Sequence, residues 1–212
     1  MTLELYLLRH GQTDFSRENR FCGAIDPPLN AIGRRMAEAL AAAYADTGWT
    51  AIYSSPRIRA RETATPLALA ARVPIDLDEG LAEIAYGAWE GLGHDEVMAR
   101  YPDAYAYWSH DPASRGTPGG ETAFHVAARA TPAINRIRER HTSGRVLVVS
   151  HKATLRIVMC ALLGMDVRLF RERMAQPVAA LTCFEIGTRG PLLKLHGDIS
   201  HLPSELRGLE GT

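Results

Sequence analysis

Cysteine is scarce in this sequence, and no apolar run is long. The chain has 212 residues, of which three are cysteines, Cys22, Cys160 and Cys183. A small, odd number of widely spaced cysteines argues against a disulfide framework and favours reduced thiols, so we expect a cytoplasmic protein. The N-terminus lacks the basic start and apolar core of a signal peptide, and no stretch is long enough to cross a bilayer. We therefore expect no membrane partner.

An excess of either charge is also absent. The 24 lysines and arginines balance 24 aspartates and glutamates. This balance argues against a protein that binds nucleic acid through a general basic field, although a local basic pocket is compatible with it. With 46% hydrophobic residues, the composition is that of a globular protein. We find no repeat, low-complexity tract or linker, and we predict a single domain over residues 1–212.

Short apolar runs alternate along the chain with longer helical patterns. The runs predict strands at residues 3–8, 51–54, 75–77 and 145–150. The helical patterns fall at residues 31–44, 60–71, 121–141 and 152–163. This alternation is typical of an α/β fold with a largely parallel sheet.

Four residues should shape these helices. Asn30 can cap the helix that begins at residue 31, and Gly164 can end the helix that begins at residue 152. Pro66 and Pro132 lie inside helical patterns, where we expect them to kink or break the helix.

Two segments stand outside the alternating pattern. Residues 91–120 contain Trp108 and several tyrosines, and we interpret them as an insertion with one or two short helices lying over the site. Residues 179–186 and 192–195 predict a strand pair late in the chain. The edge of that pair offers a place where a homodimer could form.

Two histidines directly follow predicted strands. His10 comes after the first strand, and His151 comes after residues 145–150. Because ligands in open α/β sheets bind beyond the carboxyl ends of the strands, both histidines are where a site is expected. Either one alone could be a hydrogen-bonded structural residue. Two at equivalent strand ends, with Arg9 beside one of them, favour a functional pair.

Residues 54–61, Ser-Ser-Pro-Arg-Ile-Arg-Ala-Arg, lie where another strand gives way to a helix. Arg57, Arg59 and Arg61 could bind phosphate through paired N–H donors, which the planar guanidinium group presents well. The plainer interpretation is a solvated, basic helix start. Because positive charge at a helix N-terminus opposes the helix dipole, this cluster favours a nearby anion.

Glu83 is an acidic residue among apolar neighbours, in Leu-Ala-Glu-Ile-Ala. Burial at this position would raise its pKa and let it hold a proton near neutral pH, as a general acid must. A surface carboxylate on an irregular loop is the alternative.

Several blocks, taken in order, resemble the histidine phosphatase superfamily, also called the phosphoglycerate mutase-like family. The Arg-His-Gly triplet of residues 9–11 is weak by itself, whereas the ordered set is highly specific. The resemblance covers nearly the whole chain and implies a three-layer α/β/α sandwich with a mostly parallel central sheet. The blocks are Leu-Arg-His-Gly-Gln-Thr at 8–13, Asn-Arg-Phe-Cys-Gly at 19–23, Ser-Ser-Pro-x-x-Arg-Ala-x-x-Thr-Ala at 54–64, Leu-x-Glu and Gly-x-Trp-Glu-Gly at 81–91, Gly-Gly-Glu at 119–121 and Val-Val-Ser-His at 148–151.

The resemblance implies roles for residues of this chain. His10 would be the nucleophile that becomes phosphohistidine, and Glu83 would donate a proton to the leaving oxygen. Arg9, Arg59 and His151 would hold the transferring phosphoryl group. A neutral imidazole is available at pH 7, since its ordinary pKa is about 6.5. Two arginines and a protonated His151 could stabilise the phosphoryl group electrostatically, and no metal ligand set or cofactor motif is apparent.

Other residues of these blocks are expected to bind substrate. Ser16 stands where mutase-type members carry asparagine, and it could still offer a hydroxyl group to phosphate. Phe21, Cys22 and Gly23 belong to the loop after the first block, and Cys22 replaces a common serine or threonine. Lys152 replaces a frequent glycine after the second histidine. It either adds positive charge near the pocket or lies on the surface of its helix.

Two competing phosphatase motifs are weaker. Cys183 and Arg189 have the Cys-x5-Arg spacing of cysteine phosphatases, but the alternating apolar residues between them predict a strand with no helix after it. Asp76 and Asp78 faintly resemble an aspartyl-phosphatase start, but no magnesium ligand set follows.

These observations favour a metal-independent phosphomonoesterase that acts on a small phosphorylated metabolite through a phosphohistidine on His10. The nearest alternative is a phosphoglycerate mutase that depends on 2,3-bisphosphoglycerate. Residues 91–120 look shorter than the corresponding part of mutases, which favours water as the acceptor. A non-catalytic module that binds a phosphate ligand is a further alternative, and it is disfavoured because every proposed catalytic residue is present.

Overall fold

A six-stranded sheet with the order β3-β2-β4-β1-β5-β6 forms the centre of the molecule. The computed structural model describes residues 2–209 and 211. β1 to β4 run parallel, whereas β5 runs antiparallel to β1 and forms a hairpin with β6. The predicted, mostly parallel sheet and the late strand pair are therefore confirmed. The strands are β1 (Leu3–Arg9), β2 (Ala51–Ser54), β3 (Ile75–Leu77), β4 (Gly144–Ser150), β5 (Leu181–Gly187) and β6 (Gly190–Asp198).

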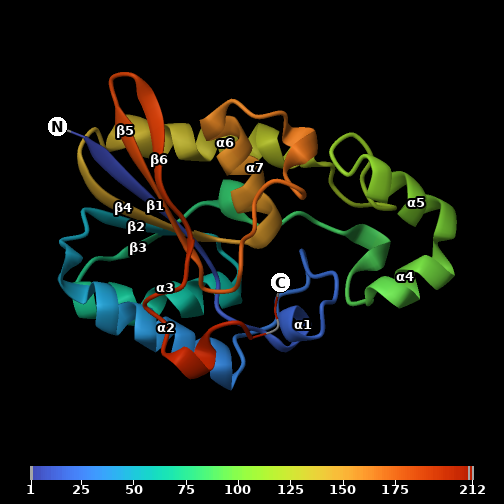
Figure 1. Ribbon diagram of the computed structural model, residues 1–212, viewed down its shortest axis with the longest axis horizontal. Coiled ribbons are helices and arrows are strands. Elements are labelled where there is room, and N and C mark those ends of the chain that lie inside the picture. The colour runs from blue at the N-terminus through green and yellow to red at the C-terminus, as the bar shows by residue number, and fades with distance from the viewer. Residues whose placement is uncertain (1, 210, 212) are drawn as a thin grey trace.

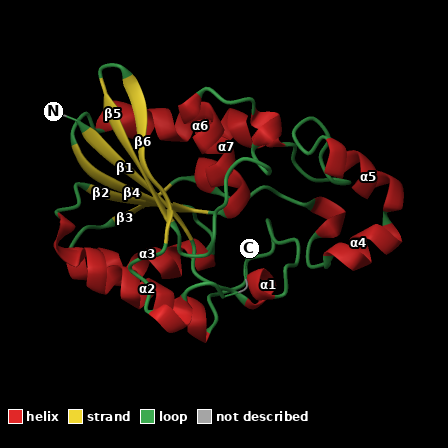
Figure 2. Ribbon diagram, viewed as in Figure 1, coloured by secondary structure: helices red, strands yellow, loops and turns green. Residues whose placement is uncertain are grey.

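Helices cover both faces of the sheet. α2 (Ala31–Tyr44) and α3 (Ile58–Ala71) lie against one face, and α6 (Ala123–Arg140) and α7 (Lys152–Leu163) lie against the other (Figures 1 and 2). This is the expected α/β/α sandwich. The short helices are α1 (Asp14–Arg17), α4 (His94–Arg100) and α5 (Pro102–His110), with 3-10 turns at Ala45–Thr47, Glu79–Leu81, Gly87–Trp89, Val167–Leu169 and Ser204–Leu206.

Side chains of the central strands alternate between two cores. Leu5 and Leu7 of β1 belong to the core under α6 and α7, whereas Leu8 belongs to the core that contains Leu40 of α2 and Leu67 of α3. All five are fully or almost fully buried. Burial on both faces explains why β1 is a nearly continuous apolar run rather than an alternating one.

The predicted helix ends are confirmed. Asn30 caps α2, because its Oδ1 accepts a hydrogen bond from the Gly33 N–H at 2.9 Å. α7 ends at Gly164, which adopts a left-handed conformation with a φ of 65°.

A break at either helix proline is wrong, since α3 runs continuously through Pro66 and α6 through Pro132, whereas a kink at these positions stays a prediction. Pro66 is half-buried and Pro132 is exposed, so neither lies on the face that packs against the sheet. The carbonyl group that each proline leaves without an N–H partner can therefore stay near solvent, and the buried face of the helix is undisturbed.

Residues 91–120 contain α4 and α5, as predicted, and extend beyond the carboxyl ends of the parallel strands (Figure 1). Trp108 of this segment is buried in a cluster with Phe21, Trp89 and Val97. The ring centroids of Phe21 lie 5.2 Å from Trp89 and 5.5 Å from Trp108. Aromatic packing therefore joins the segment to the loop after β1.

The β6 strand forms one edge of the sheet and exposes Leu192, Leu193 and Leu195. A homodimer through this edge stays a prediction. The extent of the domain, 1–212, also stays a prediction, and its residues 1, 210 and 212 lie outside the described ones. In the described part of the chain, we find no helix with the length and apolar character needed to cross a membrane.

Candidate active site

His10 lies at the carboxyl end of β1, beside the end of β4. Its backbone N–H donates to the Ser150 carbonyl at 3.0 Å, and its Nδ1 lies 2.7 Å from the Gly11 carbonyl oxygen. Because a carbonyl only accepts hydrogen bonds, Nδ1 carries the ring proton and Nε2 keeps its lone pair. Nε2 has no hydrogen-bond partner among residues 2–209 and 211, and His10 lines a cavity of about 140 Å³.

The loop after His10 is held by close backbone contacts. The Gly11 N–H donates to Thr63 Oγ1 at 2.9 Å, and that hydroxyl donates to the Arg59 carbonyl at 2.7 Å. A Cβ atom on Gly11 would lie 2.7 Å from the Gly33 carbonyl oxygen, which is too close for any side chain. The Arg-His-Gly triplet therefore requires its glycine because the first turn of α2 packs directly against this loop.

The electrostatics around His10 favour the neutral imidazole. Burial lowers the pKa of His10 well below its usual value, and the positive charges of Arg59 and Arg9 lower it further. At neutral pH the ring is thus unprotonated at Nε2. A phosphoryl acceptor needs that lone pair.

His151 faces His10 from the end of β4, with the two ring centroids 5.1 Å apart. Its Nδ1 accepts a hydrogen bond from Arg59 Nε at 3.2 Å, and its Nε2 lies 2.7 Å from Ser55 Oγ. Since Arg59 Nε only donates, the one ring proton sits on Nε2. Burial, with the charge of Arg59, also lowers the pKa of His151 well below its usual value. His151 is therefore neutral in the ligand-free protein, and its protonation beside a bound phosphoryl group stays a prediction.

Arg59 is fully buried and held by backbone oxygens. Its Nη1 donates to the Ile25 carbonyl at 2.9 Å and lies 3.4 Å from Asp26 Oδ1. Its Nη2 donates to the carbonyls of Gly23 at 3.2 Å and Cys22 at 3.4 Å. The 3.4 Å hydrogen bond from Nη2 to the Cys22 carbonyl is weak, so an incoming phosphoryl oxygen can replace it at little cost.

Arg9 is buried beside His10. Its Nη1 donates to the Gln176 carbonyl at 2.7 Å, and its Nε has no partner among the described residues. Burial lowers the pKa of Arg9 to about 9, which still leaves the guanidinium charged at neutral pH. A buried cation with a donor left over suits a phosphoryl oxygen.

The anion expected near the arginine cluster is Asp26. Both of its carboxylate oxygens lie 2.9 Å from the Ile58 N–H at the start of α3, where the helix dipole stabilises negative charge. Arg57 and Arg61 do not line the cavity, whereas Arg59 does. Arg59, which the resemblance selected, is thus the one of the three at the cavity, and its contact with a phosphoryl group stays a prediction. The sequence analysis assigned no role to Asp26.

Glu83 lies at the N-terminus of α7. Its Oε1 accepts hydrogen bonds from the backbone N–H groups of Ile84 at 2.9 Å and Thr154 at 3.1 Å, and it lies 3.0 Å from the Thr154 hydroxyl. Its Oε2 accepts one bond, from the Ala153 N–H at 3.2 Å. Glu83 is buried yet lines the cavity, so the surface-carboxylate alternative is wrong. Oε2 accepts fewer hydrogen bonds than Oε1, so it is the better placed of the two oxygens to carry a proton.

Four of the other predicted substrate-binding residues line the cavity: Ser16, Phe21, Cys22 and Lys152. The Ser16 hydroxyl donates to the Thr13 carbonyl at 3.0 Å, so it must leave that bond to donate to a ligand. Burial raises the pKa of the Cys22 thiol to about 11, which keeps it protonated.

Gly23 does not line the cavity, and its role is to position the loop. A Cβ atom there would lie 1.9 Å from the Ile84 carbonyl oxygen, so the backbones of the two loops touch. The Gly23 carbonyl also accepts from Arg59. The predicted contact with substrate stays a prediction.

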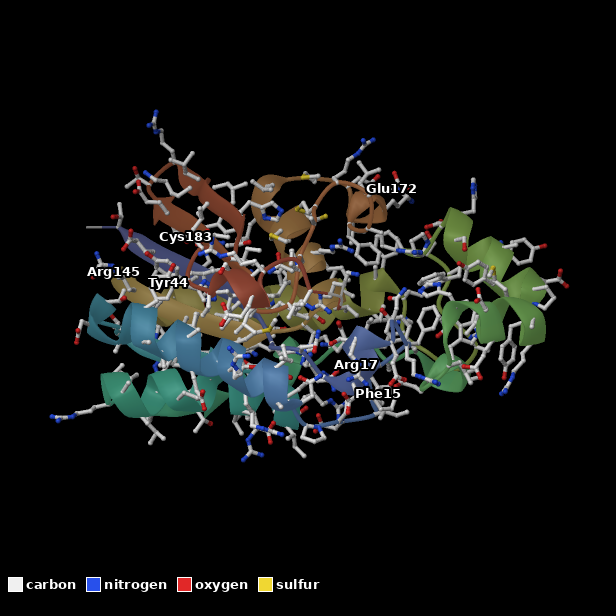
Figure 3. All side chains as sticks on the ribbon, turned by 60° about the horizontal axis from the view of Figure 1, so that its bottom comes forward. Phe15, Arg17, Tyr44, Arg145, Glu172 and Cys183 are labelled. Carbon is white, nitrogen blue, oxygen red and sulfur yellow. The ribbon has the colours of Figure 1, made fainter. Side chains whose placement is uncertain are left out.

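The polar residues of the cavity to which the sequence analysis gave no role include His94, Arg156 and Arg171. Arg156 lies four residues after Lys152 on α7, and this spacing places both on one helix face. That signal was present in the sequence. No comparable signal marked His94 or Arg171, which reach the cavity from α4 and from the loop after Val167–Leu169. α1 borders the same region. In Figure 3 its residues Phe15 and Arg17 lie between the sheet on one side and helices α4 and α5 on the other.

Glu90 anchors the loop that carries Cys22 and Gly23. Its carboxylate accepts hydrogen bonds from the backbone N–H groups of Gly23, at 3.1 and 3.0 Å, Ala24, at 2.8 Å, and Ile25, at 3.1 Å. It also accepts from the Tyr86 N–H at 2.8 Å. One side chain thus holds both walls of the cavity.

Glu90→Ala is expected to lower the free energy of unfolding by about 2–4 kcal/mol, because four backbone N–H groups, of which those of Gly23 and Tyr86 are part-buried, lose their charged acceptor together. Thermal denaturation monitored by circular dichroism measures this loss. Glu90→Gln keeps one acceptor oxygen and should lose less. Glu38→Ala, on the outer side of α2, is the control, and an equal loss in that variant would contradict the anchoring role.

The model of the histidine phosphatase superfamily (branch 1) matches residues 5–199, which include His10, Arg59, Glu83 and His151. The chain belongs to the histidine phosphatase superfamily. The family expectation is thus confirmed.

Relatives of this histidine phosphatase include enzymes with defined names. It is 33% identical over 168 residues to phosphoserine phosphatase 1 of Hydrogenobacter thermophilus, covering 79% of this chain and 80% of the relative. It is 35% identical over 171 residues to glucosyl-3-phosphoglycerate phosphatase of Mycolicibacterium vanbaalenii, covering 77% of this chain and 75% of the relative. Among solved structures, Bacillus stearothermophilus YhfR superposes with a TM-score of 0.88 at 33% identity, covering 94% of this chain and 98% of that one.

Proposed function

We propose that this histidine phosphatase is a phosphomonoesterase in which His10 Nε2 accepts the phosphoryl group of a small phosphorylated metabolite and passes it to water. The observation that carries the proposal is the state of His10. Its Nδ1 proton is held by the Gly11 carbonyl, and burial with two arginines keeps the ring neutral. A nucleophile in that state needs no base to activate it.

In the first step, the Nε2 lone pair attacks phosphorus and the P–O bond to the alcohol breaks. The leaving oxygen takes the proton from Glu83 Oε2 and departs as a neutral alcohol. Glu83 becomes a carboxylate, which the N–H groups of Ala153 and Thr154 stabilise at the start of α7. His10 becomes a phosphoramidate.

In the second step, a water oxygen attacks phosphorus and the N–P bond breaks. The water proton goes to Glu83, which is then ready for another cycle, and His10 returns to its neutral form. Inorganic phosphate leaves. Each step moves one phosphoryl group and one proton, so the enzyme ends as it began.

Arg9 and Arg59 supply the positive charge that the transferring group requires. Both are buried, so their interaction with a phosphoryl dianion is stronger than it would be in water. His151 stays neutral until substrate binds, and the negative charge then favours its protonated form. In this proposal no step depends on a metal ion.

Water rather than a second phosphorylated metabolite is the proposed acceptor. The support comes from relatives that are named as phosphatases, for phosphoserine and glucosyl-3-phosphoglycerate, and from the compact segment of residues 91–120. The free thiols of Cys22, Cys160 and Cys183 support a reducing compartment, and we propose the cytoplasm.

A phosphate-release assay with p-nitrophenyl phosphate, combined with rapid acid and alkaline quenching, tests the proposed function. We expect steady release of phosphate and a phosphoenzyme that is stable in alkali and lost in acid, as a phosphoramidate is. A mutase would instead require 2,3-bisphosphoglycerate and release little phosphate. That result would contradict the proposal.

A further inference from the structure

Three cations of the cavity have no acidic partner. Lys152, Arg156 and Arg171 line it, and none forms an ion pair with a carboxylate among residues 2–209 and 211. All three are partly buried, and Arg156 Nε is inaccessible and without a hydrogen bond. Partly buried charges without partners are costly for a folded protein.

Arg129 shows how this fold can satisfy a structural arginine. Arg129 pairs with Glu121 at 2.9 Å and donates to the carbonyls of Gly80 at 3.0 Å and Ala82 at 2.7 Å. Arg57 and Arg138 are also partly buried without a carboxylate partner among the described residues, but neither lines this cavity, whereas Lys152, Arg156 and Arg171 line it together.

The three cations share one region of the cavity. Lys152 and Arg156 lie one turn apart on α7, so both side chains leave the same face of that helix. The Arg171 guanidinium carbon lies 3.9 Å from the centre of the Trp108 ring, a cation–π contact that holds it at the cavity wall. None of the three is needed for the transfer steps at His10, where Arg9 and Arg59 act.

We propose that Lys152, Arg156 and Arg171 form a subsite for an oxyanion on the leaving group. The preferred substrates are then phosphate monoesters whose alcohol carries a second anionic group, a carboxylate or another phosphate. This inference rests on the proposed phosphatase function and adds the substrate class. An oxyanion between the three side chains supplies the negative charge that the protein itself does not.

The state of Lys152 fits this role. Burial, together with repulsion from Arg9, Arg156 and Arg171, lowers its pKa to about 7, whereas Glu83 acts in the opposite direction. His94 of α4 also faces this ammonium group. A bound oxyanion relieves the repulsion, so binding and protonation of Lys152 support each other.

Two substrates that differ only in the proposed anion test the subsite. 3-Phosphoglycerate carries a carboxylate where glycerol 3-phosphate carries a hydroxymethyl group. We expect kcat/KM to be at least about tenfold higher for 3-phosphoglycerate, the effect of one charged hydrogen bond. Fructose 1,6-bisphosphate compared with fructose 6-phosphate tests a second phosphate in the same way and shows which anion is preferred.

Variants identify the residues responsible. Lys152→Met, Arg156→Met and Arg171→Met should each lower the preference for 3-phosphoglycerate by about tenfold. Arg173→Met is the matched control, because Arg173 is exposed and does not line the cavity, and it should leave the preference unchanged. Equal losses on both substrates in the three variants would indicate a structural role and overturn the subsite.

The pH dependence gives a second readout. The ratio of the two kcat/KM values cancels the titration of the shared phosphate and of the catalytic groups. Because the Lys152 ammonium is present below its pKa, the ratio should be highest below pH 7 and fall as the pH rises through about 7. The arginine in Lys152→Arg stays charged, so the ratio of the two kcat/KM values in this variant should not change with pH. A flat ratio in the unaltered enzyme overturns this role of Lys152.

The subsite and the proposed function fail in different ways. If p-nitrophenyl phosphate is hydrolysed but 3-phosphoglycerate shows no preference, the subsite is wrong and the phosphatase function stands. If no substrate is hydrolysed, calorimetric binding of 3-phosphoglycerate and glycerol 3-phosphate still tests the subsite. Tighter binding of the carboxylate supports it, and equal binding overturns it.

Discussion

His10→Ala is expected to lower kcat/KM for p-nitrophenyl phosphate by about 10⁴-fold or more, because no other group can supply the first bond to phosphorus. His151 cannot replace His10. Its Nδ1 lone pair is held by Arg59 Nε, and its Nε2 carries a proton directed at Ser55. The variant loses the nucleophile while Arg9 and Arg59 remain, so substrate binding should persist.

The measurement is phosphate release under conditions in which both proteins are folded. His10 is 5% exposed, so the alanine leaves a small cavity, and circular dichroism must show an unchanged fold. His10→Gln fills more of that space and should be equally inactive. His110→Ala, at the exposed end of α5, is the control for loss of a histidine. Turnover by folded His10→Ala would show that phosphate transfers directly to water.

The strand ends could be predicted from the sequence because they follow from local patterns. β1 and β4 are apolar runs, and parallel strands place the residues that follow them at one edge of the sheet. His10 and His151 therefore lie close together because each directly follows one of two neighbouring parallel strands, as the sequence predicted. The contact between them is a direct consequence of that register, in which Arg9 lies opposite Ser150.

The residues that fix the loops could not be predicted in the same way. Glu90 and Asp26 accept hydrogen bonds from the backbone N–H groups of other segments, and only the whole fold brings those segments close to the two carboxylates. The protonation state of His151 is another such case, since it depends on the 3.2 Å contact with Arg59, a residue 92 positions away. Pattern reasoning identifies what side chains a site has. Packing decides which hydrogen bonds they have already made.

The two prolines show the opposite error, in which a local rule was applied where packing overrides it. Pro66 and Pro132 remove one helical hydrogen bond each, yet α3 and α6 stay continuous. Leu67 of α3 and Ile134 of α6 are buried on the inner faces of these helices. Burial of such side chains contributes about 1.5–3 kcal/mol each, so several of them outweigh the cost of a proline of about 3 kcal/mol.

Glu83→Gln is the second large effect, and its size should depend on the leaving group. An alkyl oxygen is a poor leaving group and needs a proton as the P–O bond breaks, whereas p-nitrophenolate departs without one. We expect kcat/KM to fall by about 10²–10⁴-fold for 3-phosphoglycerate, and far less for p-nitrophenyl phosphate. Steady-state assays of both substrates measure this difference.

The same substitution should also alter the second step, because Glu83 takes the proton of the attacking water. With p-nitrophenyl phosphate, the first step stays fast and the second becomes slow, so a burst of p-nitrophenol and an accumulated phosphoenzyme are expected. Glu121→Gln is the matched control: Glu121 also accepts a backbone N–H, that of Ala85 at 2.9 Å, but it does not line the cavity. If Glu83→Gln slows both substrates equally and produces no burst, Glu83 positions the N-terminus of α7 and another group moves the proton.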